Sequence, residues 1–111
     1  MSFASDSENL VNQLIQAEYE NACNKWGNKY HSLHEGYAVL LEEIEETERE
    51  FLSLKSNLSR LWYNIKNNDD ELVSFYQDVL ENNTIQGLQE LAQVGVVLMK
   101  IKNTLGGENG N

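Results

Sequence analysis

Residues 33–67 read LHEGYAVLLEEIEETEREFLSLKSNLSRLWYNIKN, and this stretch decides the fold. Apolar side chains recur in it at every seventh position: Tyr37, Ile44, Phe51, Leu58 and Ile65. The chain has no proline, and no glycine lies between Tyr37 and Gln86. Heptad spacing without helix-breaking residues is typical of a long amphipathic helix. We therefore predict one helix from about Leu33 to about Asn67.

Helix-capping residues flank this segment. Ser32 and Glu35 have the spacing of a capping box, with Ser32 as the N-cap. The polar run 67–70 supplies a stop and the N-cap of the next helix. Upstream, residues 10–26 keep helical spacing, and Gly27 is expected to end that helix.

Two further helices are predicted downstream. Apolar residues between Leu72 and Leu80 indicate a short helix, and Asn83 or Thr84 is expected to cap another that continues to about Ile101. The fold class predicted is therefore all-α: an antiparallel bundle of about four helices with one long central helix. We expect a single helical domain over residues 1–111, with a disordered tail over about 105–111.

The predicted length of the central helix indicates an oligomer. At about 1.5 Å per residue, 35 residues span about 50 Å, whereas a compact chain of this size is about 34 Å across. A second copy is expected to cover the helix, which predicts a homodimer or a homotetramer. The alternative is a helix kinked near residues 53–59, where Ser, Asn and Lys cluster.

Composition excludes several classes of function. The 111 residues include 18 acidic and 8 basic side chains, for a net charge of −10. Binding to duplex nucleic acid is not expected, because phosphate affinity comes from Lys and Arg. No apolar run approaches the roughly 20 residues of a transmembrane helix, and no secretory signal is visible. The lone Cys23 cannot form an internal disulfide. We therefore expect a cytoplasmic protein without a membrane partner.

The acidic residues are concentrated in one part of the predicted long helix. Seven of the 18 lie between Glu35 and Glu50. Glu42, Glu43 and Glu46 share one helix face and repel one another unless a cation is present. Hard divalent cations such as Mg²⁺ prefer oxygen ligands of this kind. The alternative is a solvated acidic face, as in most Glu-rich helices.

A second acidic position favours the cation site. Glu90 lies within the apolar run LQELAQV, with Gln93 three residues later. A buried carboxylate needs a partner, and basic residues are scarce. A metal shared by Glu43, Glu46 and Glu90 would satisfy it.

The segment HEGYAVLLEEIEE at residues 34–46 resembles the EExxE motif of the MazG-like all-α nucleoside triphosphate pyrophosphohydrolases, particularly short members from phages and Gram-positive bacteria. The resemblance covers about residues 10–102. In that family a second helix carries ExxD, and here the corresponding residues are Glu90 and Gln93. Gln93 thus replaces an aspartate, which removes one negative ligand.

This resemblance implies an Mg²⁺-dependent hydrolysis of a nucleoside triphosphate to a monophosphate and pyrophosphate, with Mn²⁺ as a substitute ion. It implies a catalytic set and a metal-binding set of residues. The catalytic set is Glu42, Glu43, Glu46 and Glu90. The metal set is Glu43, Glu46, Glu90 and Gln93, the last through its carbonyl oxygen. Glu42 would support the other ligands or position water.

Four residues near the start of the long helix are candidates for binding the nucleotide. Lys25 and Lys29 could meet phosphates, and Trp26 could stack on a base. His34 adjoins the motif near a helix N-terminus, which favours anions. The alternatives are ordinary exposed lysines, an aromatic plug at a helix end and a surface histidine.

Two other functions are open. A non-catalytic helical oligomer that acts as an interaction or regulatory protein is favoured by Gln93 and by the scarcity of basic residues. The net charge of −10 could also steer binding to a basic protein partner.

Overall fold

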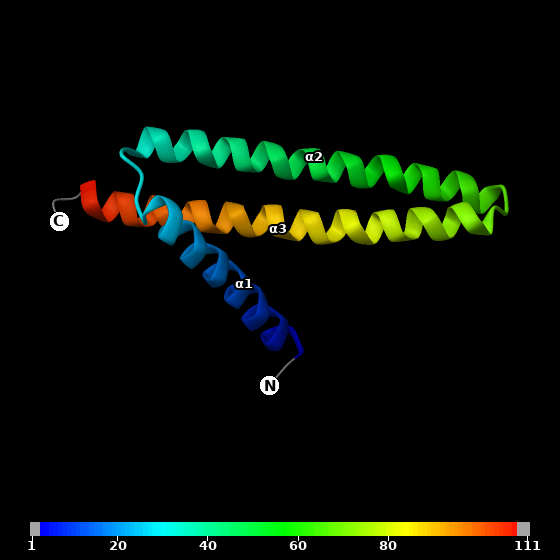
Figure 1. Ribbon diagram of the computed structural model, residues 1–111, viewed down its shortest axis with the longest axis horizontal. Helices are drawn as coiled ribbons and strands as arrows, with labels where there is room; N and C mark the ends of the chain where they lie inside the picture. Colours follow the sequence, from blue (N-terminus) through cyan, green and yellow to red (C-terminus); the bar gives the residue numbers. More distant parts are fainter. Residues whose placement is uncertain (1–2, 109–111) are drawn as a thin grey trace. The chain divides into compact units, whose positions relative to one another are not determined.

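The computed structural model describes residues 3–108, with side chains from Ser5 to Gly106. Over this range it contains three α-helices and no strand, which confirms the all-α prediction (Figure 1). The helices are α1 (Phe3–Trp26), α2 (Leu33–Lys66) and α3 (Asp70–Glu108). None of them combines the length and the hydrophobicity that a membrane span requires.

The predicted caps of α2 form as expected. The Ser32 hydroxyl accepts a hydrogen bond from the Glu35 backbone N–H at 3.1 Å, and the Glu35 carboxylate accepts one from the His31 backbone N–H. Gly27 ends α1 with φ of 81°, a left-handed conformation that glycine adopts without steric cost.

The turn between α2 and α3 is short. Asn68 has φ of 55°, and the Asp69 carboxylate accepts a hydrogen bond from the Leu72 backbone N–H at 3.1 Å. Asp69 is therefore the N-cap of α3.

The prediction of a helix break at Asn83–Thr84 is wrong, because α3 runs through this point without interruption. The Thr84 hydroxyl donates to the Leu80 carbonyl one turn earlier, at 2.9 Å. The Asn83 side chain accepts a hydrogen bond from Asn57 on α2. Both residues are thus satisfied inside a continuous helix, and the two predicted C-terminal helices are one.

The α2 helix is continuous through residues 53–59, in agreement with the predicted helix over about Leu33–Asn67 and not with the alternative of a break there. One other boundary differs from expectation. The α3 helix continues to Glu108, four residues into the segment expected to be disordered. Residues 109–111, the rest of that predicted tail, lie outside the described residues.

The described chain divides into two compact units. The three-helix unit combines residues up to Ile44 with residues from Leu91 onward, and the hairpin unit comprises residues 45–90. We describe each unit separately.

The three-helix unit contains the buried apolar side chains of the described structure. Ala92, Val96 and Val97 of α3 are only 3–4% exposed. A Cβ added at Gly95 would lie 3.1 Å from the Ile15 side chain of α1, so these two helices approach closely there. Small and β-branched residues on α3 therefore form the core of this unit.

The hairpin unit has a polar interior. Its buried side chains are Thr47, Asn57 and Asn64 of α2, and no large apolar residue among those described is buried in this unit. Asn57 donates to Asn83 of α3 at 2.9 Å and accepts from Arg60 at 3.1 Å. Asn64 donates to the Arg60 carbonyl at 2.8 Å. A hydrogen-bonded network thus connects the two helices of the hairpin.

The heptad stripe that predicts α2 is exposed. Its five residues are 41–65% exposed: Tyr37, Ile44, Phe51, Leu58 and Ile65. Trp62 is also exposed, and the Lys66 ammonium lies 5.5 Å from its ring centroid. The stripe forms the helix as predicted, yet the buried side chains of α2 in the hairpin unit are the polar Thr47, Asn57 and Asn64 beside it.

Candidate metal centre

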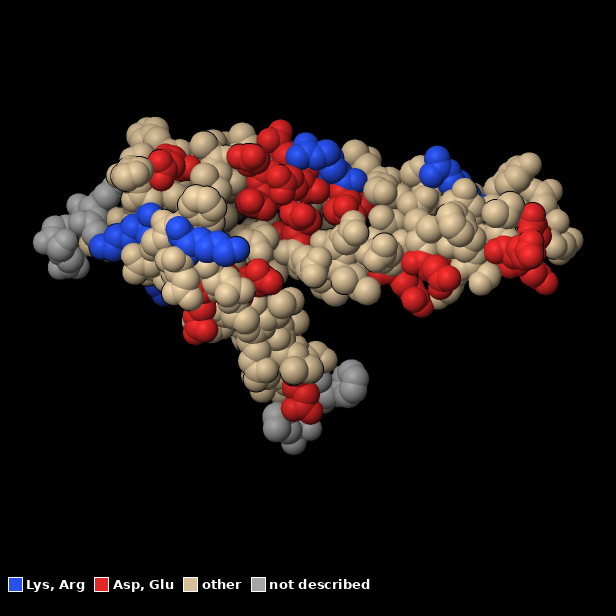
Figure 2. Space-filling model, in the orientation of Figure 1, with Lys and Arg blue, Asp and Glu red and all other residues tan. Residues whose placement is uncertain are grey.

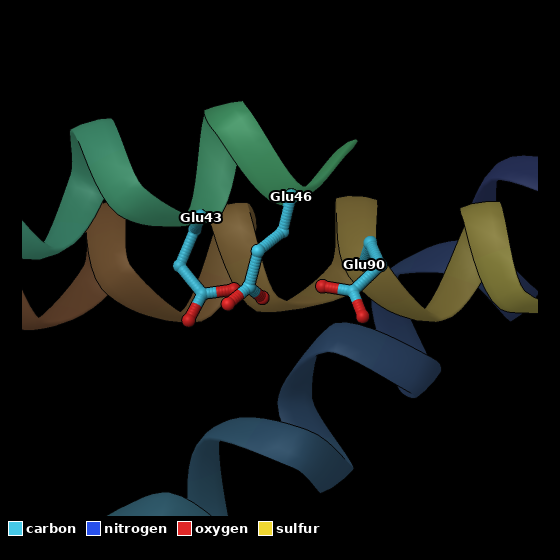
Figure 3. Close-up of side chains that lie close together, drawn as sticks. All are labelled: Glu43, Glu46 and Glu90. Atoms are coloured by element: carbon cyan, nitrogen blue, oxygen red, sulfur yellow. The ribbon is translucent and has the colours of Figure 1, made fainter. Parts of the chain in front are cut away.

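Three of the predicted ligands converge. Glu43 and Glu46 project from α2, and Glu90 projects from α3 toward them (Figure 3). Each side chain offers one carboxylate oxygen, and these three oxygens lie within 4.8 Å of one another. All three residues are partly buried. Glu46 and Glu90 belong to the hairpin unit, and Glu43 lies one helical turn before Glu46 on the same helix.

The local sequence explains this arrangement. Glu43, Glu46 and Glu50 follow one another at intervals of three and four residues, which places them on one face of α2. The same face continues into Asn57, whose side chain contacts α3. Acidic side chains gather on α2 in the space-filling view, with basic side chains beside them (Figure 2).

Electrostatics within the cluster make the carboxylates costly to ionise together. Burial raises the pKa of Glu90, and a hydrogen bond with Glu46 raises it further. The negative charges of Glu46 and Glu50 act in the same direction, whereas the positive charge of Arg49 lowers the Glu90 pKa. In the absence of a cation, Glu90 therefore holds a proton more tightly than an ordinary carboxyl group does.

Sequence reasoning missed Glu50 as a member of this cluster. Its Oε2 atom is buried and has no hydrogen-bond partner among the described residues. An isolated buried carboxylate oxygen is expensive unless a proton or a cation satisfies it. The spacing of Glu50, four residues after Glu46, is the signal that could have identified it.

The residues fit a hard divalent cation. All the donors are carboxylate oxygens, the ligand type that Mg²⁺ and Mn²⁺ prefer. Oxygens around an octahedral Mg²⁺ ion are about 3.0 Å apart when adjacent and about 4.2 Å apart when opposite, given metal–oxygen distances of about 2.1 Å. The three carboxylate oxygens lie within 4.8 Å of one another, somewhat beyond these separations. Small side-chain adjustments would bring the oxygens to coordination distance.

Two predicted site residues lie apart from this cluster. Glu42 is exposed and is not part of the converging group. Gln93, in the three-helix unit, donates from Nε2 to the Glu18 carboxylate of α1 at 2.9 Å. No sequence pattern indicates Glu18, because only the packing of α1 on α3 brings it to Gln93. The Glu18 carboxylate thus places one negative charge beside Gln93, which stands where the resembled family has an aspartate.

The four predicted substrate-binding residues are all exposed on the three-helix unit. Lys25 and Trp26 end α1, Lys29 lies in the following loop, and His34 lies in the first turn of α2. Trp26 is 77% exposed, so it is not a plug at the helix end. His34 lines a small hollow of about 220 Å³ with Leu33 and Tyr37.

Tyr30 lies in the same loop and was not predicted. Its backbone N–H donates to the Thr104 hydroxyl at 2.8 Å, and the Lys100 ammonium lies 4.4 Å from its ring centroid. Burial raises the Tyr30 pKa, as do the negative charges of Glu43 and Glu35. Tyr30 thus anchors the loop to α3 and lies within the electrostatic field of a predicted ligand.

No family model matches this sequence, and no curated protein or solved structure is significantly similar to it.

Proposed function

We propose that this protein is an Mg²⁺-dependent nucleotide pyrophosphohydrolase of the MazG-like type, which converts a nucleoside triphosphate and water to a monophosphate and pyrophosphate. The observation that supports this most is the convergence of Glu43, Glu46 and Glu90 from two helices. The buried, unpartnered oxygen of Glu50 supports it further.

In this proposal the carboxylates of Glu43, Glu46 and Glu90 hold the cation, and Glu50 adds a fourth oxygen ligand from the same face of α2. When bound, Mg²⁺ supplies positive charge that neutralises and orients the phosphates. Burial and the neighbouring carboxylates raise the pKa of Glu90, so a bound cation would compete with a proton for its carboxylate. Gln93 acts indirectly, because its amide donates to Glu18.

The remaining chain supplies the substrate contacts. Lys25 and Lys29 would attract the phosphates, Trp26 would stack on the base, and His34 would add a donor near the start of α2. All four side chains are exposed and therefore accessible to a ligand. The exposed apolar stripe of α2 supports the homodimer or homotetramer expected from the helix length.

Calorimetric titration with Mg²⁺ and Mn²⁺ tests the site first. We expect binding in the native protein and loss of binding in Glu43→Gln, Glu46→Gln and Glu90→Gln. Glu45→Gln is the matched control, since it removes an equal charge from an exposed position on the same helix. Equal weakening by Glu45→Gln would show that only the general charge of α2 attracts the cation, and would reject the site.

Pyrophosphate release from a panel of nucleoside triphosphates tests the activity. We expect release that requires Mg²⁺ and fails in Glu46→Gln. The second candidate, a non-catalytic helical oligomer, is favoured by the Glu18–Gln93 hydrogen bond, which occupies the side chain at the ExxD position. Metal binding without pyrophosphate release from any triphosphate would favour that candidate.

A further inference from the structure

A neutral side chain, Gln93, follows Glu90 by one helical turn, and the structure brings a carboxylate to it from another helix. Gln93 of α3 donates a hydrogen bond from Nε2 to the Oε2 atom of Glu18 on α1, at 2.9 Å. The two residues are 75 positions apart in the chain, and both are partly buried. A negative charge therefore lies beside position 93, although the residue at that position is neutral.

The hydrogen bond explains why an amide suits position 93 better than an acid. An ionised carboxylate only accepts hydrogen bonds, so the group that faces Glu18 at this distance has to donate. An acidic residue at position 93 would place a second carboxylate against Glu18, and two carboxylates so close do not ionise together. Glutamine donates a hydrogen bond and leaves Glu18 charged. The pair thus combines one acid, on α1, with one amide, on α3.

Glu18 keeps the capacity to bind a further donor. A carboxylate has two oxygens with about four acceptor sites, and Gln93 occupies one of these sites. The nearest basic residues along the two helices are Lys25 on α1 and Lys100 on α3, each seven residues away and so about 10 Å along the axis. No adjacent turn of either helix therefore neutralises the Glu18 charge.

Glu18 lies near the carboxylate cluster without belonging to it. Gln93 is three residues after Glu90, so the two side chains share one face of α3 and are about 4.5 Å apart along its axis. Glu18, Gln93 and the proposed ligand Glu43 all belong to the three-helix unit. Glu18 is outside the group whose oxygens lie within 4.8 Å of one another. Mg²⁺ keeps several waters when carboxylates bind it, and these waters need acceptors beyond the ligands themselves.

We propose that Glu18, oriented by the Gln93 amide, accepts a hydrogen bond from a water molecule on the cation that Glu43, Glu46 and Glu90 hold. Glu18 and Gln93 are positioning residues for the hydrated cation and do not ligate it directly. The inference rests on the proposed function, because it concerns the same metal site. It makes cation binding depend on α1, which contributes no ligand.

Calorimetric titration with Mg²⁺ and with Mn²⁺ tests the role of Glu18. In Glu18→Gln, an amide–amide hydrogen bond can still join α1 to α3, but the charge is lost, so we expect cation affinity to fall about tenfold or more. Glu20→Gln is the matched control. It removes an equal charge from an exposed position on α1 and also alters a hydrogen bond between a glutamine and a carboxylate, that from Gln16 to Glu20. We expect it to have little effect on affinity.

An exchange variant tests whether the pair acts as a unit. Glu18→Gln/Gln93→Glu moves the acid to α3 and the amide to α1, and so keeps both the charge and the hydrogen bond. It should recover most of the affinity lost in Glu18→Gln. An exchange variant that binds as weakly as Glu18→Gln would overturn the proposal, as would equal weakening by Glu20→Gln.

Urea unfolding of the same variants separates a role in cation binding from a purely structural link between α1 and α3. We expect Glu18→Gln to lose affinity while it keeps native stability. Lost stability with native affinity would overturn the proposal. The Glu90→Gln variant distinguishes its failure from that of the proposed function. Affinity that is lost in Glu90→Gln but unchanged in Glu18→Gln would overturn this inference alone, whereas a native protein that binds neither ion would overturn both.

Discussion

The two units of this protein differ in the side chains that they bury. In the three-helix unit, the buried residues include Ala92, Val96 and Val97, and polar groups such as Thr104 attach the loop before α2. In the hairpin unit, the buried residues are polar, and Phe51 and Leu58 face outward. Both units leave large apolar side chains exposed, but among the described residues only the three-helix unit buries apolar side chains almost completely.

This difference indicates that the units gain stability from different sources. Burial of apolar area contributes about 25 cal/mol per Å², so the three-helix unit can hold itself together. A hydrogen bond contributes only about 1 kcal/mol net to stability. A few such bonds between two helices therefore make the hairpin unit only marginally stable. The hairpin unit also has less buried apolar area to stabilise it than the three-helix unit has.

The largest effect expected comes from placing a charge in the three-helix core. Val97→Asp should lower the free energy of unfolding by about 3–5 kcal/mol, because an unpaired carboxylate would be buried. Leu58→Asp on the hairpin unit should change the stability of the dilute monomer by less than about 0.5 kcal/mol. Urea unfolding measures both. Similar losses for the two variants would contradict the comparison.

A smaller effect is expected in the interior of the hairpin unit. Asn57→Ala should cost about 1–3 kcal/mol, because it leaves Asn83 and Arg60 without their hydrogen-bond partner. Replacing both partners, as in Asn57→Leu/Asn83→Leu, should recover part of that loss, since neither amide is then left without the other, while the exposed Arg60 still loses its acceptor. Thermal unfolding of the single and double variants provides the measurement. A double variant less stable than Asn57→Ala would show that the network contributes more than its pairwise bonds.

Glycine substitutions should have opposite signs in the two units. A Cβ at Gly36, in the three-helix unit, would lie 2.9 Å from Ile101 Cγ1 and 3.2 Å from the Tyr30 ring, so Gly36→Ala should destabilise by about 1 kcal/mol. A Cβ at Gly87, in the hairpin unit, would meet nothing within 4 Å. Gly87→Ala should stabilise by about 0.5–1 kcal/mol through helix propensity. The denaturant concentration at the unfolding midpoint should fall in Gly36→Ala and rise in Gly87→Ala.

The smallest effect expected is a pH dependence that arises in the acidic cluster. The pKa of Glu90 is raised in the folded state, so folded protein binds its proton more tightly than unfolded protein does. The free energy of unfolding should therefore fall as pH rises through the folded-state pKa, where Glu90 becomes charged beside Glu46 and Glu50. Denaturation from about pH 5 to about pH 8 measures this slope. Glu90→Gln should flatten it, and a slope unchanged by that substitution would assign the effect elsewhere.

Much of the fold was predictable, because the residues that decide it act locally. The ends of α2 and the turn after it depend on Ser32, Glu35 and Asp69, which bond within three or four residues. The continuity of α3 was not predictable, because Asn83 resembles a cap. Its side chain is instead satisfied by Asn57, 26 residues away.

The candidate site was predictable to a similar degree. Glu43, Glu46 and Glu90 converge as the helical spacing and the family resemblance implied. Glu50 shares that spacing, four residues after Glu46, but it lies outside the EExxE segment on which the resemblance rests. Glu18 could not have been identified, because the α1–α3 packing that brings it to Gln93 depends on contacts far apart in the sequence.

The attachment of α1 has a consequence for local opening of the chain. Its contacts with α3 involve Ile15, Glu18 and Tyr19, all in its second half, whereas residues 5–14 are exposed throughout. An isolated helical segment of ten residues is marginal in water. Amide hydrogens in residues 5–14 should therefore exchange with solvent far faster than those near Val96, through fraying that leaves the rest of the three-helix unit folded. Deuterium uptake should therefore be fast in the first half of α1 and slower in its second half.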